Sequence, residues 1–235
     1  MNSAHKISVL TWCYSRQHYL NATLGAWMEQ KGIDYEIVVG RGPNINVPEH
    51  WGNPVVKTTV THKLGINSAY NQIMAAASGD ILLITQCDML VQDPYQLRKM
   101  LDRWNERTMV TEKFMKEGKR DPGIYLQFAM VSKQAVEDVG GWYEGYDCPT
   151  TAAHEDADLV CRLMRHGLDL EMIESPTDKT VYHLDHPKPD YFNDPVVLEK
   201  LKNGKALFDS RNPEGVMHLY DKQMVRNHMQ RHVNV

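Results

Sequence analysis

Three groups of side chains along the sequence could do chemistry. The first is Asp88, which follows the continuous apolar run 81–84 after only a short polar interval. A carboxylate just beyond a buried strand could bind a hard divalent cation, and the cation could in turn bridge a diphosphate. Asp is also common in the turns that follow strands, so a purely structural role stays open for this residue.

The second group is the acidic segment 154–158, which reads His-Glu-Asp-Ala-Asp. Acidic residues in a first helical turn complement the helix dipole and can cap its amides, which requires no catalysis. The wider segment 137–178 is strongly acidic, however, with only Arg162 and Arg165 as its basic residues. Carboxylates crowded at one end of a sheet could include a general base, so both interpretations stay open.

The third group is the histidine pair of segment 182–186, His183 and His186. Histidine is a common metal ligand, but an isolated histidine is more often structural or solvated. A ligand role is therefore the less expected of the two.

Composition and charge limit the class of protein in which these side chains could act. A chain of 235 residues that is 42% hydrophobic and 24% charged predicts one globular domain, or one domain with a small appendage, and excludes disordered and fibrous classes. The net charge of −4 gives no sign of whole-chain binding to nucleic acid or anionic membrane. The apolar run 7–10 is too short for a signal peptide or a membrane span.

The cysteines are far apart and form no CxxC pair, which predicts free thiols in a reducing, cytoplasmic compartment. They are Cys13, Cys87, Cys148 and Cys161.

The elements that position these groups alternate between strand and helix. Apolar and β-branched runs predict strands at 7–10, 35–39, 55–61 and 81–84, and helical spacing predicts helices over 20–28 and 66–77. This order predicts a mostly parallel sheet, in which ligands bind at the carboxyl ends of the strands.

The second half of the chain is less regular. A helix is expected to start at Asp93-Pro94, followed by a charged surface excursion over 105–123. A strand at 124–131, a short helix at 133–139 and a one-sided helix over 159–164 come next. Prolines then mark a seam before a C-terminal helical segment, 197–235.

Taken in order, several short motifs resemble family 2 nucleotide-sugar glycosyltransferases of the GT-A fold. The segments that carry the resemblance are SVLTWCYSR (8–16), YEIVV (35–39), NSAYN (67–71), ASGD (77–80), VGGWYE (139–144) and HEDADL (154–159). The second half is also similar to galactosyl- and N-acetylgalactosaminyltransferases. The resemblance covers residues 6–185. It implies an α/β, Rossmann-like GT-A domain over 1–186, with a mostly parallel central sheet flanked by helices, and a C-terminal helical extension over 187–235.

The resemblance also implies an activity and its machinery. A sugar would move from a nucleotide-sugar donor, a UDP-sugar first, to an acceptor hydroxyl with inversion. Asp156 would be the general base, with Glu155 beside it shaping the acceptor site, and Asp88 with His183 would hold Mn²⁺ or Mg²⁺. The donor-binding residues would be Trp12, Tyr14, Arg16, Arg41, Asn67, Asn71, Gln86 and Cys87. Trp142 and Glu144 would bind the acceptor.

The sequence departs from the family pattern at three positions. Gln86 replaces the first Asp of the DxD motif, and because an amide carries no charge, metal binding would be weaker or rest more on His183. Arg41 follows Gly40 where an acidic pair is usual, so the nucleotide is less certain. Trp12 stands where proline is usual, which affects the floor of the nucleoside pocket.

Alternatives remain at this point. The chain could be a GT-A binding module that has lost catalysis, a nucleotidyltransferase, or a retaining enzyme. Aromatic side chains at 142, 143 and 146 could stack on an acceptor or simply pack. The net positive tail after Val196 could contact a nucleic acid or an anionic lipid surface, or be a solvated helix pair. The acceptor could thus be a glycan, a glycoconjugate or a modified DNA base.

Overall fold

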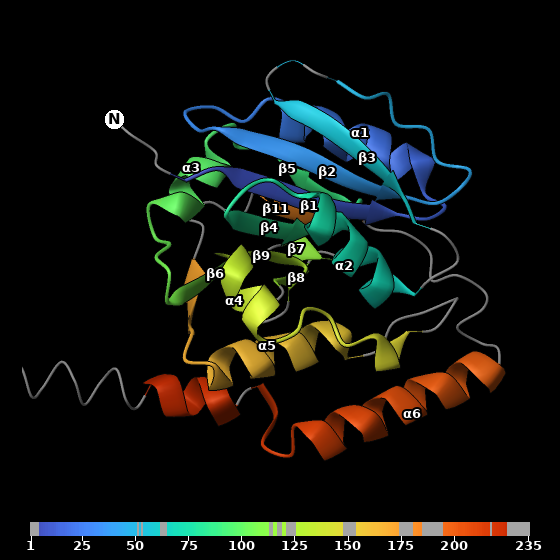
Figure 1. The fold of residues 1–235 in the computed structure, drawn as a ribbon, viewed down its shortest axis with the longest axis vertical. Helices are drawn as coiled ribbons and strands as arrows, with labels where there is room; N and C mark the ends of the chain where they lie inside the picture. Colours follow the sequence, from blue (N-terminus) through green and yellow to red (C-terminus); the bar gives the residue numbers. More distant parts are fainter. Residues whose placement is uncertain are drawn as a thin grey trace, which may run out of the picture.

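The computed structural model describes residues 5–50, 52, 54–61, 65–112, 115–116, 119–120, 126–147, 154–173, 181–184, 195–216 and 218–224. Within them a seven-stranded sheet lies between helices (Figure 1). Its strands, in spatial order, are β10 (Asp169–Ile173), β6 (Thr108–Glu112), β9 (Phe128–Ser132), β4 (Ile81–Thr85), β1 (Ile7–Cys13), β2 (Tyr35–Arg41) and β3 (Val55–Val60). A smaller sheet has the order β5 (Met89–Val91), β11 (Val181–His183), β7 (Met115–Lys116) and β8 (Lys119–Arg120).

The large sheet is mostly parallel, as the alternation of strands and helices predicts. Strands β4, β1, β2 and β3 are mutually parallel, and only β9 runs antiparallel to both of its neighbours. All five residues of β4 are buried, because both faces of this strand are covered. The prediction of an α/β sheet flanked by helices is therefore confirmed.

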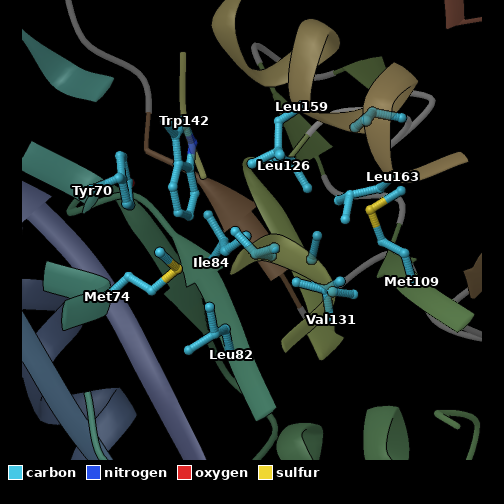
Figure 2. Close-up of a cluster of buried hydrophobic side chains, with 14 of the residues drawn as sticks. Tyr70, Met74, Leu82, Ile84, Met109, Leu126, Val131, Trp142, Leu159 and Leu163 are labelled. Carbon is cyan, nitrogen blue, oxygen red and sulfur yellow. The ribbon is translucent and has the colours of Figure 1, made fainter. Parts of the chain in front are cut away.

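The helices cover the two faces and divide the apolar interior. They are α1 (Gln17–Met28), α2 (Ile66–Ala76), α3 (Gln96–Leu101), α4 (Lys133–Asp138), α5 (Glu155–Arg165), α6 (Pro195–Arg211) and the 3-10 turn η1 (Glu144–Tyr146). Alternate residues of β1 point to opposite faces, so Val9 packs in the cluster with α1 and α3, and Leu10 in the cluster with α2, α4 and α5. Figure 2 shows the second cluster, where side chains of α2, β4 and α5 meet around Trp142.

The charged segment 105–123 is exposed at 105–107, as its composition predicts, but is buried at 108–112. It contains β6, whose five residues are all buried between β9 and β10. The carboxylate of Glu112, at the end of β6, is buried and accepts a hydrogen bond from the amide of Gln96 on α3. The charges around Asn105 and beyond Glu112 conceal this strand in the sequence. The strand predicted at 124–131 lies at Phe128–Ser132, and residues 121–125 are outside the described part.

The C-terminal helices share the core of the main domain. Phe208 of α6 and Val216 are buried in the cluster that contains α5, and α6 lies beside α5 in Figure 1. Residues 218–224 are also helical, and the remainder of the predicted extension, 187–194 and 225–235, lies outside the described residues. Among the helices that the structure describes, none is both long and apolar enough to cross a bilayer.

Candidate functional site

The carboxyl ends of β1, β2 and β4 form the edge where ligand-binding residues are expected. The loops after β1 and β2 are locked together, because the Gly42 amide donates to the Cys13 carbonyl oxygen at 2.9 Å. A Cβ atom on Gly42 would lie 2.4 Å from the Tyr14 carbonyl oxygen, so only glycine allows this approach. Tyr14 and Arg41 are thereby held at neighbouring positions on one edge.

Asp88 lies at the centre of this edge and is paired with a cation from the same chain. Its side chain is only 4% exposed, and its Oδ2 atom accepts a hydrogen bond from Nη1 of Arg16 at 2.9 Å. The antiparallel pairing of β11 with β5 also brings His183 close, with its Nε2 atom 3.9 Å from Oδ1 of Asp88. The Leu184 amide donates to the Asp88 carbonyl oxygen at 2.8 Å. The structure thus brings together Arg16, Asp88 and His183, which are remote in sequence.

These residues do not form a ready-made site for a divalent ion. Mn²⁺ and Mg²⁺ take about six ligands, preferably oxygens. Within the described part of the chain, no three His, Cys, Asp or Glu side chains are grouped so as to hold a metal. The one carboxylate, Asp88, is paired with a guanidinium, and Gln86 contributes only a neutral amide. His186 and Asp185 fall outside the described residues.

The other donor-side residues predicted from the sequence surround this centre. The indole Nε1 of Trp12 donates to the Thr61 hydroxyl at 3.0 Å, and its ring lies 6.0 Å from that of Tyr14. Nη1 of Arg41 donates to the Ile45 carbonyl oxygen at 3.1 Å, which holds the arginine across the β2 loop. Cys87 is buried, and its thiol lies against that of Cys13. Cys13, Cys87 and Cys161 are free thiols, and Cys148 lies outside the described residues.

Asn67 has a buried side-chain amide on the donor side of the site. Its side chain is fully buried at the start of α2, yet neither atom of its amide has a hydrogen-bonding partner among the described residues. The backbone there is satisfied by Asp147, whose carboxylate accepts from the Asn67 amide at 2.8 Å and from the Ser68 amide at 3.0 Å. Asp147 therefore caps α2 from the far side of the site, a role that the sequence analysis does not anticipate.

Asn71 is occupied by the glycine turn that precedes η1. Its Nδ2 atom donates to the Trp142 carbonyl oxygen at 3.0 Å and to Oε1 of Glu144 at 2.8 Å, and its Oδ1 atom accepts from the Trp142 amide at 2.9 Å. Gly141 has a φ of +67° and lies against this amide, which excludes a larger residue. The described contacts make Asn71 a residue that positions the turn, and its predicted contact with the donor stays a prediction.

Trp142 packs in the hydrophobic core. It is 3% exposed and stacks on Tyr70 with 5.1 Å between ring centroids (Figure 2). Tyr146 is also buried, so the packing alternative holds for both rings. Glu144 and Tyr143 are exposed, and the Arg211 guanidinium lies 3.8 Å from the centre of the Tyr143 ring. The ring of Trp142 is therefore largely covered by packing in this structure, and its predicted acceptor role stays a prediction.

Tyr70 joins the two halves of the site. Its hydroxyl donates to the Thr85 carbonyl oxygen at the end of β4 at 2.7 Å. Burial raises the pKa of this hydroxyl well above its usual value, and the nearby Cys87, Asp88 and Glu155 raise it further. Tyr70 therefore stays neutral between the Asp88 centre and the start of α5. It belongs to the NSAYN segment, where its position in the motif is the only signal in the sequence.

The first turn of α5 presents Glu155 and Asp156. The helix begins after His154, whose φ of +64° turns the chain sharply into it, and Oδ1 of Asp156 accepts from the Ala157 amide at 2.7 Å. Oε2 of Glu155 is shielded from solvent and has no hydrogen-bonding partner among the described residues. Burial, followed by the charges of Asp156 and Asp147, raises the pKa of Glu155 to about 8. At neutral pH this turn thus carries one protonated acid beside Asp156.

The raised pKa of Glu155 predicts a pH-dependent stability. The folded chain holds this proton up to about pH 8, whereas an unfolded Glu releases it near pH 4.5, so the free energy of unfolding falls as pH rises through this window. We expect Glu155→Gln to raise Tm at pH 9 by about 2–4 °C, equivalent to roughly 1 kcal/mol, and to leave Tm at pH 4 unchanged. Thermal melts at both pH values check this. Glu137→Gln on the exposed face of α4 is the control, and an equal shift at both pH values would contradict the expectation.

A hollow of about 830 Å³ lies at the opposite edge of the sheet, outside this site. It is open to solvent and is lined by residues at the amino ends of β1 and β4 and at the end of α5, among them His5, Asp80, Trp104, Lys133 and His166. None of the residues predicted to act in binding or catalysis lines it. We therefore place the candidate site at the carboxyl edge of the sheet, where the predicted residues lie, and do not choose it by cavity volume.

Several solved structures are similar to this chain in fold. TarS of S. aureus matches over 77% of this chain and 37% of its own, with 14% sequence identity and a TM-score of 0.60. Its segment 1–349 in complex with UDP-GlcNAc matches over 89% of this chain and 67% of its own, with 14% identity and a TM-score of 0.65. The mannosyltransferase PcManGT of Pyrobaculum calidifontis, in complex with GDP-Man and Mn²⁺, matches over 94% of this chain and 74% of its own, with 15% identity and a TM-score of 0.58.

The chain has the GT-A fold. At 14–15% identity the likeness concerns the fold, and the chain spans about a third of the full TarS chain. No protein-family model and no curated protein matches the sequence. In this GT-A sheet the Arg16–Asp88 pair lies where β1 and β4 end, and Tyr70 connects it to the Glu155–Asp156 turn.

Proposed function

We propose that this GT-A chain is a glycosyltransferase that moves a sugar, a hexose or pentose, from a nucleotide-sugar donor to an acceptor hydroxyl. One observation carries the proposal: a charged centre at the end of β4 and a carboxylate pair at the start of α5 flank the same buried tyrosine, Tyr70. The fold neighbours in complex with UDP-GlcNAc and GDP-Man support a nucleotide-sugar donor. A UDP-sugar is the first candidate.

The donor would lie across the ends of β1, β2 and β4. Trp12, Tyr14 and Arg41 would hold the nucleoside, since aromatic faces and a guanidinium can stack on a base. The amide of Asn67, which has no hydrogen-bonding partner in the described part of the chain, supports a polar ligand group beside it, because a buried amide is normally hydrogen-bonded. Gln86 and Cys87 would contribute backbone or amide contacts near the diphosphate.

Transfer then needs one proton acceptor. Asp156 would take the proton of the acceptor hydroxyl while the acceptor oxygen forms its bond to the anomeric carbon. The bond between that carbon and the diphosphate oxygen breaks, and its electron pair leaves with the diphosphate. Attack from the face opposite the leaving group inverts the anomeric centre. Glu155 and Glu144 would face the acceptor, a glycan, a glycoconjugate or a modified DNA base. No step passes through a metal, because the described residues do not fit one.

A ligand screen tests the proposal. Melting of the chain would be followed with UDP, GDP, CDP and TDP, each with Mn²⁺ or with EDTA. A nucleotide at about 100 times its dissociation constant adds about 2.7 kcal/mol to the free energy of unfolding, which raises Tm by roughly 5–10 °C in a chain of this size.

We expect one nucleotide to shift Tm far more than the others, and its sugar conjugate to release the free nucleotide when incubated with the protein. Binding without release over a day would favour the alternative of a binding module that has lost catalysis. A cooperative melt that no nucleotide shifts would overturn the proposal.

A further inference from the structure

A guanidinium lies beside Asp88, the residue that the resemblance in the sequence implies as a metal ligand. The Arg16–Asp88 contact is a direct ion pair at 2.9 Å, with the aspartate side chain 4% exposed and the arginine 28% exposed. A carboxylate this well covered needs a compensating charge, and Arg16 supplies it without any bound ion. The arginine also has N–H donors beyond the one that binds Asp88, because a guanidinium has five.

The leaving diphosphate makes a specific demand on this centre. Negative charge builds on it as the glycosidic bond breaks, and a positive group must already be in place to stabilise that charge. Guanidinium groups bind phosphate oxygens with two parallel hydrogen bonds and remain charged at all working pH values. Arg16 therefore has the chemistry that the diphosphate requires.

The position of Arg16 in the fold favours this role. It is the residue that precedes α1 (Gln17–Met28), and the first turn of this helix has neither an acidic residue nor a side-chain cap. The positive end of the helix dipole thus lies in the same place as the guanidinium. Asp88, which follows the buried β4 strand, holds the arginine through this ion pair. The guanidinium is therefore in position before a ligand binds.

We propose that Arg16, oriented by Asp88, is the cation that binds the donor diphosphate and stabilises its departure, so that donor binding does not require a divalent metal ion. This inference rests on the proposed function. In the transfer step Arg16 exchanges no proton. It hydrogen-bonds the phosphate oxygens, which gain the electron pair of the broken glycosidic bond, while the acceptor proton passes to Asp156.

The first experiment uses the unmodified protein. After treatment with chelator, binding of the nucleoside diphosphate selected in the ligand screen is measured by calorimetry in EDTA and again with 1 mM Mn²⁺ or Mg²⁺. We expect dissociation constants that agree within about twofold in all three buffers. Binding that appears only with a metal ion would overturn the inference and leave the proposed function standing. Absence of binding in every buffer would instead remove the proposed function and the inference with it.

Two substitutions separate the roles of the ion pair. Arg16→Gln should weaken diphosphate binding by about 10- to 100-fold, and added Mn²⁺ should not restore it. Asp88→Asn should weaken binding only a few-fold, because the amide oxygen of Asn can still accept the hydrogen bond that orients Arg16. If Asp88 is instead a metal ligand, Asp88→Asn should abolish metal-dependent binding and Arg16→Gln should spare it.

Two further variants act as controls. Arg98→Gln removes an exposed arginine from α3 and should change nothing. Arg16→Lys keeps a charge but loses the planar fork, so it should bind with intermediate affinity. The melting temperature of each variant is measured first. If Arg16→Gln fails to fold, the metal comparison on the unmodified protein still decides the question.

Discussion

Replacing Asp156 by Asn should lower the rate of sugar transfer by about 10²- to 10⁴-fold, the range typical for loss of a general base. Asp156 is in the first turn of α5, with one oxygen bound to the Ala157 amide, and an Asn side chain can keep that contact but cannot accept the acceptor proton. The affinity for the nucleoside diphosphate should stay within twofold, because the proposed donor-side residues lie on α2 and around the ends of β1, β2 and β4, and none lies on α5. The measurement is turnover of the donor at saturating acceptor, together with calorimetry.

Asp138→Asn is the matched control for this experiment. It removes an exposed carboxylate from α4, at the opposite edge of the sheet, and should leave the rate unchanged. A rate for Asp156→Asn within tenfold of that of the unmodified protein would contradict the assignment of Asp156 as the general base. Glu155→Gln would then be the next variant, since that side chain shares the same turn.

Replacing Asp158 by Ala should destabilise the chain by about 3–5 kcal/mol, the usual cost of leaving a buried charge unpaired. Asp158 is fully buried, and its two oxygens accept from Nε of Arg162 at 2.8 Å, Nε of Arg211 at 3.0 Å and Nδ2 of Asn212 at 2.9 Å. Burial alone would raise the pKa of Asp158, but the bonds from Arg211, Asn212 and Arg162 outweigh it and lower the pKa. Denaturant unfolding at pH 7 measures the loss.

The Asp158→Ala substitution should loosen the packing of both the C-terminal helices and the glycine turn. Nη1 of Arg162 also donates to the carbonyl oxygens of Val139 and Gly141 at 2.6 and 2.7 Å, so the same arginine that binds Asp158 holds the turn beside Asn71. Asp209→Ala, which breaks an exposed ion pair with Lys205 on α6, is the control and should cost less than about 1 kcal/mol. A loss as small as that for Asp158→Ala would contradict the assignment of Asp158 as the buried tie between α5 and α6.

The sequence predicts those elements whose pattern is local. The run 81–84 is apolar without interruption and forms β4, and the alternation of strand and helix up to residue 85 gives the parallel half of the sheet. Strand β6 is not predicted because its one charged residue, Glu112, is buried and accepts a hydrogen bond from Gln96, a contact that no pattern within 108–112 reveals. Strand β11 has three residues, too few to show a period.

For the candidate site too, the sequence predicts what depends on local patterns and not what depends on long-range contacts. Parallel strands explain why the residues that follow β1, β2 and β4 share one edge, whereas His183 reaches Asp88 through the antiparallel pairing of β11 with β5. The partners of these residues do not follow from the sequence. Arg16 is 72 residues from Asp88, and the amide of Asn71 is used by a turn 71 residues away, so only the completed fold shows that the first binds a carboxylate and the second holds a backbone.

The order of strands in the sheet also has a consequence for synthesis of the chain. β1 to β4 are complete by residue 85, but β9, which covers the open edge of β4, begins only at residue 128. At about 5–20 residues per second the ribosome needs roughly 2–9 s to make the difference. During that interval the β4 strand, apolar at four of its five residues, is an unprotected sheet edge, the kind of surface that pairs with other chains. The nascent protein therefore passes through its most aggregation-prone stage just before β9 emerges.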